Sequence, residues 1–117
     1  MKSRIENKIG YCSDKVLFSK DTDKGHYVFI VKDNFNGTCN VNVITSLEND
    51  KHEFDFKKLK QVKKGNTYSL PKYDTEFTKW SGVNHGVIKN VNISDIKNIG
   101  CKRIRRRHFY YIHKFMQ

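Results

Sequence analysis

The apolar residues of this chain occur in short runs, and the clearest two lie on either side of a turn. The run Tyr27–Val31 is almost entirely apolar, as expected for a strand covered on both faces, whereas residues 40–44 alternate like a strand with one buried face. Between them, the Asn36-Gly37 pair suits the positive φ angles of a hairpin turn. The sequence therefore predicts a central β-hairpin that is followed directly by two hydroxyl residues, Thr45 and Ser46.

The rest of the chain contributes shorter segments with strand or helix patterns. Further strands are expected at four places: residues 16–18, 52–56, 68–70 and 87–93. Ser94 and Gly100 are typical of the start and end of a short helix over residues 95–99. Apolar residues then recur at helical spacing over residues 104–115, while residues 57–66 fit either a helical turn or an irregular strand.

These elements predict one domain over residues 1–117 with a mainly β fold. Short strands with turn signals, followed by a terminal helix, are typical of a small curled antiparallel sheet or barrel. We expect about five to seven strands, short helices and a C-terminal helix. The polar residues 1–10 are expected to be frayed or loosely docked.

The composition argues against a membrane protein and against a metal protein. The longest apolar run has five residues, whereas a membrane-spanning helix needs about 20. No continuous hydrophobic stretch opens the chain, so a secretory signal is not expected. The three cysteines form no CxxC pair and are one ligand short of a zinc site, which favours reduced thiols. We therefore expect a cytoplasmic protein with no membrane partner, no metal and no other cofactor.

Charge is segregated along the chain. Residues 56–72 carry six lysines and no acidic residue, and residues 101–117 carry six Lys or Arg and no acidic residue. These two segments supply +12, which exceeds the net charge of +11 for the whole chain. A solvated surface usually mixes both signs, so this segregation favours a polyanionic partner, with nucleic acid ahead of a membrane surface.

Several short motifs follow one another in an order that matches a known family. A Gly-basic pair at Gly25-His26 leads into the apolar strand, a later strand ends in Thr45-Ser46, and residues 81–84 read Ser-Gly-Val-Asn. A strand at residues 87–91 and the segment Ile96–Gly100 complete the series. Over about residues 16–100 this order resembles the MazF/PemK family of toxin endoribonucleases. The resemblance implies a small SH3-like antiparallel barrel with a C-terminal helix, and usually a dimer, that cleaves single-stranded RNA.

The chain departs from the family pattern at two places. The family commonly has Arg-Pro before the apolar strand, with the Arg catalytic, and here His26-Tyr27 stands in that place. An acidic residue that many members carry after the Ser segment is absent, and the corresponding stretch is His85-Gly86. The Thr of the Thr-Ser pair is retained as Thr45.

RNA cleavage through the 2′-hydroxyl needs a base, an acid for the leaving 5′-oxygen and a donor for the phosphorane charge, and it needs no metal. His26 and His85 are the candidate proton-transfer groups, since histidine titrates near neutral pH. Thr45 and Ser46 are the candidate donors to a phosphate oxygen. Each of these residues also has a structural explanation. His26 could simply be held by backbone at a strand start, His85 could lie in an exposed turn, and the two hydroxyl residues could mark a plain strand end.

The expected RNA contacts come mainly from the two basic segments, with one lysine and one serine from elsewhere. They are Lys24, Lys57, Lys58, Lys60, Lys63, Lys64, Ser81, Arg103, Arg105, Arg106 and Arg107. Trp80 and the pair Tyr110-Tyr111 are candidates for base stacking, although a core position is the stronger expectation for Trp80. The expected partners are single-stranded RNA, a cognate antitoxin of protein or RNA, and a second copy of the chain in a homodimer.

Two other classes of function stay open on the sequence. One is a non-catalytic nucleic-acid-binding domain in which the basic segments do all the work and His26 is structural. The other is a protein-interaction module, for instance a phage or defence factor, whose basic face meets an acidic protein.

Overall fold

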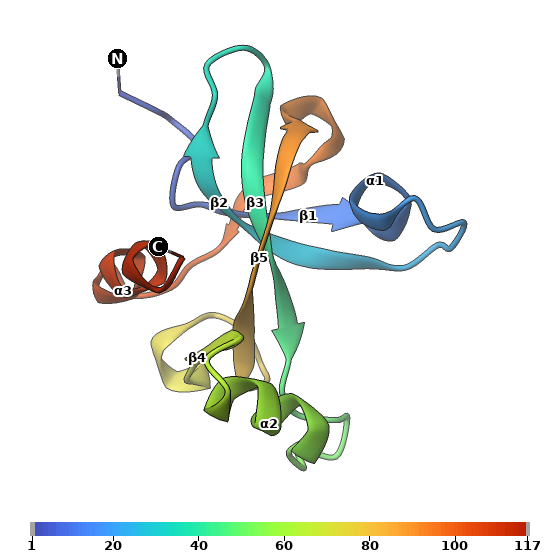
Figure 1. The fold of residues 1–117 in the computed structure, drawn as a ribbon, viewed down its shortest axis with the longest axis vertical. Helices are drawn as coiled ribbons and strands as arrows, with labels where there is room; N and C mark the ends of the chain where they lie inside the picture. Colours follow the sequence, from blue (N-terminus) through green and yellow to red (C-terminus); the bar gives the residue numbers. More distant parts are fainter. Residues whose placement is uncertain (1, 117) are drawn as a thin grey trace.

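A single antiparallel sheet organises the chain (Figure 1). The structure is a computed structural model, and it describes residues 2–116. The six strands lie in the order β4-β5-β3-β2-β1-β6, and every neighbouring pair is antiparallel. Their bounds are β1 Ile9–Ser13, β2 Gly25–Asp33, β3 Thr38–Ser46, β4 Thr67–Leu70, β5 Ser81–Asn92 and β6 Lys97–Lys102. The mainly β prediction is confirmed, with an open sheet in place of a closed barrel over the described residues.

Three short α-helices and two single turns of 3₁₀-helix connect the strands. The α-helices are α1 Asp14–Phe18, α2 Phe56–Lys63 and α3 Arg107–Phe115, and the 3₁₀ turns are η1 Lys72–Asp74 and η2 Ile93–Asp95. Figure 1 shows α1 and α3 at opposite sides of the sheet and α2 below it, beside β4. No helix within residues 2–116 is both long and apolar enough to cross a membrane.

The predicted central hairpin is confirmed as β2 and β3. Its strands pair in register from Tyr27 opposite Ile44 to Asp33 opposite Cys39, with one irregularity on the way. The turn places Gly37 at a φ of 86°, as expected, but the other positive φ, 57°, falls on Phe35 and not on Asn36.

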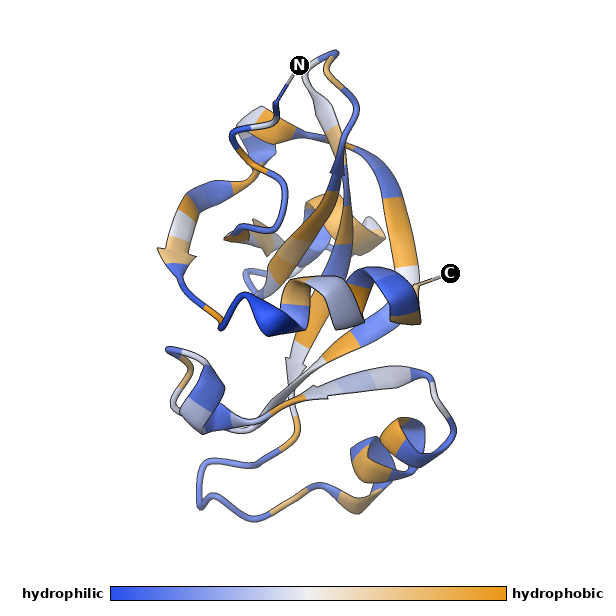
Figure 2. Cartoon of the chain, turned by 90° about the vertical axis from the view of Figure 1, so that its left-hand side faces the viewer, coloured by the Kyte–Doolittle hydropathy of each residue, from blue (hydrophilic) through white to orange (hydrophobic). Residues whose placement is uncertain are grey.

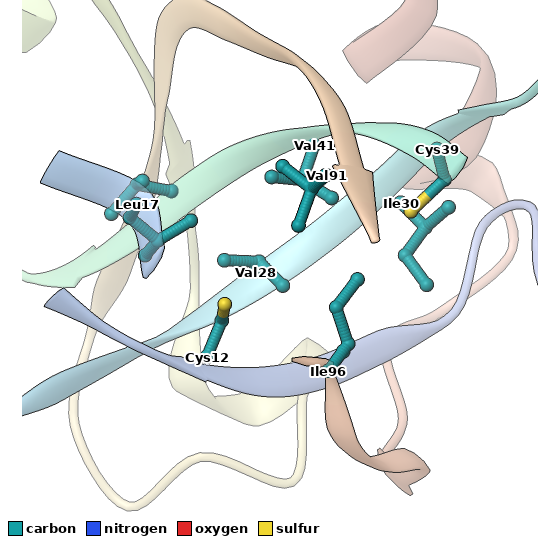
Figure 3. Close-up of a cluster of buried hydrophobic side chains, with 9 residues drawn as sticks. Cys12, Leu17, Val28, Ile30, Cys39, Val41, Val91 and Ile96 are labelled. Atoms are coloured by element: carbon teal, nitrogen blue, oxygen red, sulfur yellow. The ribbon is translucent and has the colours of Figure 1, made fainter. Parts of the chain in front are cut away.

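The fully apolar run in β2 is buried on both of its faces, as its composition predicts. Val28, Phe29 and Ile30 are all fully buried, and successive residues of a strand point to opposite sides. Val28 and Ile30 belong to one cluster, shown in Figure 3, which α1 closes through Leu17. Phe29 belongs to the second cluster, which α3 closes through Ile112.

Two local predictions before residue 60 need correction, and a third leaves two alternatives open. Residues 16–18 form the end of α1 and not a strand, because the Ser13 hydroxyl caps the helix by accepting from the backbone N–H of Val16. Residues 52–56 are not a strand, since Phe54 makes only one isolated bridge, to Glu48. The helical alternative is correct for residues 57–66: α2 begins there because the Asp55 carboxylate accepts the N–H groups of the first turn.

Two predictions near the C-terminus are also wrong in part. Residues 95–99 are not a helix, because residues 97–102 form β6 beside β1 and the positive φ of Asn98 (55°) breaks helical geometry. The terminal helix exists but begins at Arg107. Ile104 is held extended by its bridge to Thr75, so the chain cannot turn into a helix before that point.

The N-terminal segment is docked and not frayed. The Ser3 hydroxyl donates to the Asp33 carboxylate at 2.9 Å, and Glu6 Oε1 accepts the backbone N–H of Asp33, also at 2.9 Å. The Asn7 side-chain oxygen meets His113 Nε2 at 2.7 Å, and the Asn7 N–H donates to the carbonyl of Ile30. These bonds fasten the segment to the β2 end of the hairpin and to α3.

Candidate functional site

His26 is held by a buried carboxylate that the sequence did not reveal. Its Nδ1 lies 2.7 Å from Asp14 Oδ1, and the Asp14 side chain is only 10% exposed, against 34% for His26. A carboxylate only accepts, so Nδ1 carries the proton and the neutral ring keeps Nε2 as a free acceptor. Nε2 makes no hydrogen bond to any of residues 2–116, while the ring edge packs on Phe18. The arrangement is that of an oriented imidazole at the surface, suited to proton transfer.

Thr45 lies on the same side of the sheet as His26. Alternation along β3 puts Thr45 with Val43, and alternation along β2 puts His26 with Val28, and both valines belong to the cluster that α1 closes. The β2–β3 pairing ends at Tyr27 opposite Ile44, so His26 and Thr45 each lie one residue beyond the last paired position. The structure therefore places these two predicted residues on one face of the sheet, near the point where β2 and β3 stop pairing.

The Ser46 hydroxyl is occupied by local structure. It donates to the carbonyl oxygen of Glu48 at 2.6 Å and accepts the N–H of the same residue at 3.2 Å, which closes the turn after β3. Ser81 is likewise withdrawn: it is 4% exposed, and its hydroxyl donates to the carbonyl of Lys79. We therefore assign both serines to the framework and correct their expected roles in catalysis and RNA contact.

His85 does not join His26. Its ring packs edge-on against Phe115 of α3, 5.4 Å between centroids, so it lies on the α3 side of the sheet. His26 packs against α1 on the other side. The structure does not bring these two histidines together, because alternation along β5 puts His85 on the same side as Val83, which belongs to the cluster that α3 closes.

Buried carboxylates also hold two of the other histidines. His52 Nδ1 lies 2.8 Å from Glu48 Oε2, and His108 Nε2 lies 2.9 Å from Asp74 Oδ2. Taken as whole residues, the three acidic residues that bind histidines are only 5–7% exposed. No second histidine approaches His26 within residues 2–116, because each of the others is engaged elsewhere.

Four of the six lysines of the first basic segment lie on α2, and Lys64 follows directly as its C-cap. This helix buries no residue, so most of its lysines project into solvent. Lys58 is the exception, as its Nζ donates to the carbonyl oxygen of Ser46 at 2.7 Å. Lys24 is exposed in the loop before β2, and its carbonyl accepts the N–H of Asp14, which ties the loop to the His26 site.

The arginines of the second basic segment divide into two pairs. Arg105 and Arg107 bind the buried Asp74 carboxylate, at 3.1 Å and 2.5 Å, and so belong partly to the framework. Hydrogen bonds from His108 first, and then from Arg107, hold the pKa of Asp74 below its usual range. Arg103 and Arg106 are exposed and form no ion pair within residues 2–116.

A groove of about 1010 Å³ runs between the N-terminal segment and the start of α3. Phe109 and Ile104 form part of its apolar lining, and Glu6 is the one acidic residue among the described residues that line it. Six of the lining residues are basic: Lys2, Lys8, Lys102, Arg103, Arg105 and Arg106. Sequence reasoning missed the contribution of the first ten residues to this groove, since it expected them to be frayed or loosely docked.

The single tryptophan lies at the far end of the sheet. Its ring N–H donates to the Ser69 hydroxyl at 2.7 Å, and its ring packs edge-on with Phe54 and Tyr73. Trp80 is half-buried, which is consistent with the expected packing role. Tyr110 and Tyr111 are exposed on α3, at 64% and 51%.

The signals for Asp14, Glu48 and Asp74 in the sequence are weak. Asp14 follows Ser13 at a helix start, where an acidic residue is expected to be exposed and to interact with the helix dipole. Nothing local shows that its partner is His26, twelve residues away.

A search of protein-family models and of curated proteins finds no match to this chain.

Proposed function

We propose that this protein is a toxin-like endoribonuclease that cleaves single-stranded RNA without metal. The observation that carries the proposal is the His26–Asp14 pair, with Nδ1 held at 2.7 Å and Nε2 left free. A surface imidazole oriented by a buried carboxylate is the arrangement that general base catalysis requires. The sequence resemblance to the MazF/PemK family, including the SH3-like barrel that it implies, supports the same reaction.

The reaction proceeds by attack of the ribose on its own phosphate. Nε2 of His26 accepts the 2′-hydroxyl proton, the 2′-oxygen bonds to phosphorus, and the bond to the 5′-oxygen breaks. The products are a 2′,3′-cyclic phosphate and a 5′-hydroxyl end. The Thr45 hydroxyl donates to a phosphate oxygen as the phosphorane charge develops.

One histidine at the site implies a simple pH profile. With His85 on the other side of the sheet, the leaving 5′-oxygen takes its proton from solvent. The rate is therefore expected to rise through the histidine range and to reach a plateau, without the second limb of a bell-shaped profile. A bell with two histidine-range limbs would show that a second group acts.

The direct test is incubation of the pure protein with end-labelled single-stranded RNA in excess EDTA. We expect cleavage, with cyclic phosphate and 5′-hydroxyl ends identified by their response to phosphatase and polynucleotide kinase. His26→Ala should lower kcat by roughly 10²- to 10⁴-fold and Thr45→Ala by roughly 10²- to 10³-fold, with RNA binding retained. His85→Ala is the matched control and should cleave like the parent. A parent protein that cleaves no RNA would overturn the proposal.

As a toxin, the protein would pair with an antitoxin, and a small acidic protein or a repeated RNA fits its net charge of +11. A homodimer is the family arrangement. Inspection of the adjacent gene separates the two kinds of antitoxin.

The second candidate function is RNA binding without cleavage. The basic groove favours it, because it lies on the α3 side of the sheet and does not contain His26. In that case the parent binds RNA with a steep salt dependence and leaves it intact in every buffer.

A further inference from the structure

The groove between the N-terminal segment and α3 has the charge of an anion-binding site. Six Lys or Arg side chains line it, from parts of the chain that are about 100 residues apart in the sequence. Folding therefore joins the terminal basic segment to Lys2 and Lys8, which the sequence alone leaves unconnected. Figure 2 shows the hydrophilic start of α3 facing the viewer, below the N-terminal segment.

The walls of the groove are fixed by hydrogen bonds. On one side, the Ile30 N–H donates to the carbonyl of Lys8 at 3.0 Å, and Asn7 is joined to His113 of α3. On the other side, Lys102 pairs with Ile9 in the sheet. The basic side chains are thus carried by backbone that is already ordered, which lowers the entropic cost of binding a ligand.

Most of this positive charge is not neutralised by the protein. Glu6 opposes it, but one of its carboxylate oxygens accepts the N–H of Asp33. The Asp74 carboxylate forms an ion pair with Arg105 and neutralises part of its charge. The remaining basic residues of the groove form no ion pair within residues 2–116.

We propose that this groove binds the backbone of single-stranded RNA, with successive phosphates on its Lys and Arg side chains. The half-buried ring of Phe109 in the groove offers a surface for one base, and bases are free to stack in this way only when unpaired. The choice of RNA as the ligand rests on the proposed function. The inference that the groove binds phosphates rests on its charge alone. The exposed lysines of α2, which lie outside this groove, contribute only general attraction.

The test measures binding separately from cleavage. The ligand is a fluorescent 2′-O-methyl RNA of about 12 nucleotides, which lacks the attacking hydroxyl, and its anisotropy is followed across a salt series. Each phosphate contact on a single strand contributes about 0.7 log units of affinity per log unit of salt. Lys2→Gln/Lys8→Gln should therefore lower the slope by about 1.4 and weaken binding about 25-fold at 0.1 M salt.

The matched control is Lys60→Gln/Lys63→Gln, which removes the same charge from α2. Its slope should fall by much less than about 1.4, since these exposed lysines contribute only general attraction. An equal loss of affinity in both double variants, or no loss of affinity in Lys2→Gln/Lys8→Gln, would refute the proposal that the groove binds RNA. A thermal melt of each variant shows whether its fold is kept.

A second pair of measurements tests the preference for single strands. Phe109→Leu keeps an apolar side chain but removes the aromatic face, so it should weaken RNA binding several-fold and leave competition by polyphosphate unchanged. Duplex RNA of the same sequence should compete poorly, and equal competition would refute the single-strand assignment. Because the probe cannot be cleaved, its binding can be measured whether or not the protein is a nuclease. If the groove binds the probe but the protein cleaves no RNA, the proposed function is refuted and the RNA-binding groove is not.

Discussion

Replacement of Asp14 by Asn is the most informative change at the proposed catalytic site. It removes the charge beside His26 but keeps the size of the side chain. The hydrogen bond from Nδ1 to Oδ1 is 2.7 Å long, and the carboxylate is buried. A hydrogen bond to a charged group contributes about 1.5–3 kcal/mol. If the bond strengthens as His26 takes up the proton, its loss raises the activation free energy by this amount. About 1.4 kcal/mol corresponds to a tenfold change in rate, so kcat should fall by about 10- to 150-fold.

The assay is the initial rate of cleavage of a labelled single-stranded RNA under saturating and subsaturating conditions. KM should stay near the parent value, because Asp14 lines no part of the basic groove. Asp23→Asn, in the adjacent exposed loop, removes the same charge without touching His26 and is the control. A parent-like kcat in Asp14→Asn would refute the role of this pair.

Two further predictions concern stability and thiol chemistry. His108, and then Arg107, hold the pKa of Asp74 below its ordinary value of 3.8, so the network stabilises the fold above about pH 4 and loses this contribution as the pH falls through the lowered pKa. Urea unfolding at a series of acidic pH values should show this loss, and Asp74→Asn should be less stable at neutral pH with a flatter acid limb. Burial raises the pKa of the Cys39 thiol to about 11, whereas Cys101 is exposed, so a thiol reagent at neutral pH should label Cys101 first and Cys39 only on unfolding. Rapid labelling of Cys39 in the folded protein would contradict its packing.

The sequence predicted those elements whose signal is local. The hairpin of β2 and β3 is specified by apolar runs and a turn glycine, and β4 by a short apolar segment that ends at Pro71. Two of the errors fall where a distant contact decides the conformation. Residues 97–102 become β6 only because β1 offers an edge to pair with, and Ile104 stays extended only because Thr75 lies beside it.

The candidate site was predicted in part for the same reason. His26 and Thr45 follow from the strand ends, and the structure places both on one face. The partnership of His26 with Asp14 depends on how α1 packs against the start of β2, which no local pattern encodes. The pairing of Arg105 and Arg107 with Asp74 likewise joins residues about 30 apart, so sequence counting overstated the charge available to RNA.

The two proposed sites are joined by one strand. Ile9, at the start of β1, lines the groove, and Cys12, near its end, pairs with His26. At about 3.3 Å per residue, the two positions are roughly 10 Å apart along the strand, but their side chains point to opposite faces. An RNA bound in the groove must therefore pass the edge of the sheet to bring a phosphate to His26. Binding and chemistry then depend on different residues, so substitutions in the groove should act on KM and those at Asp14 or His26 on kcat.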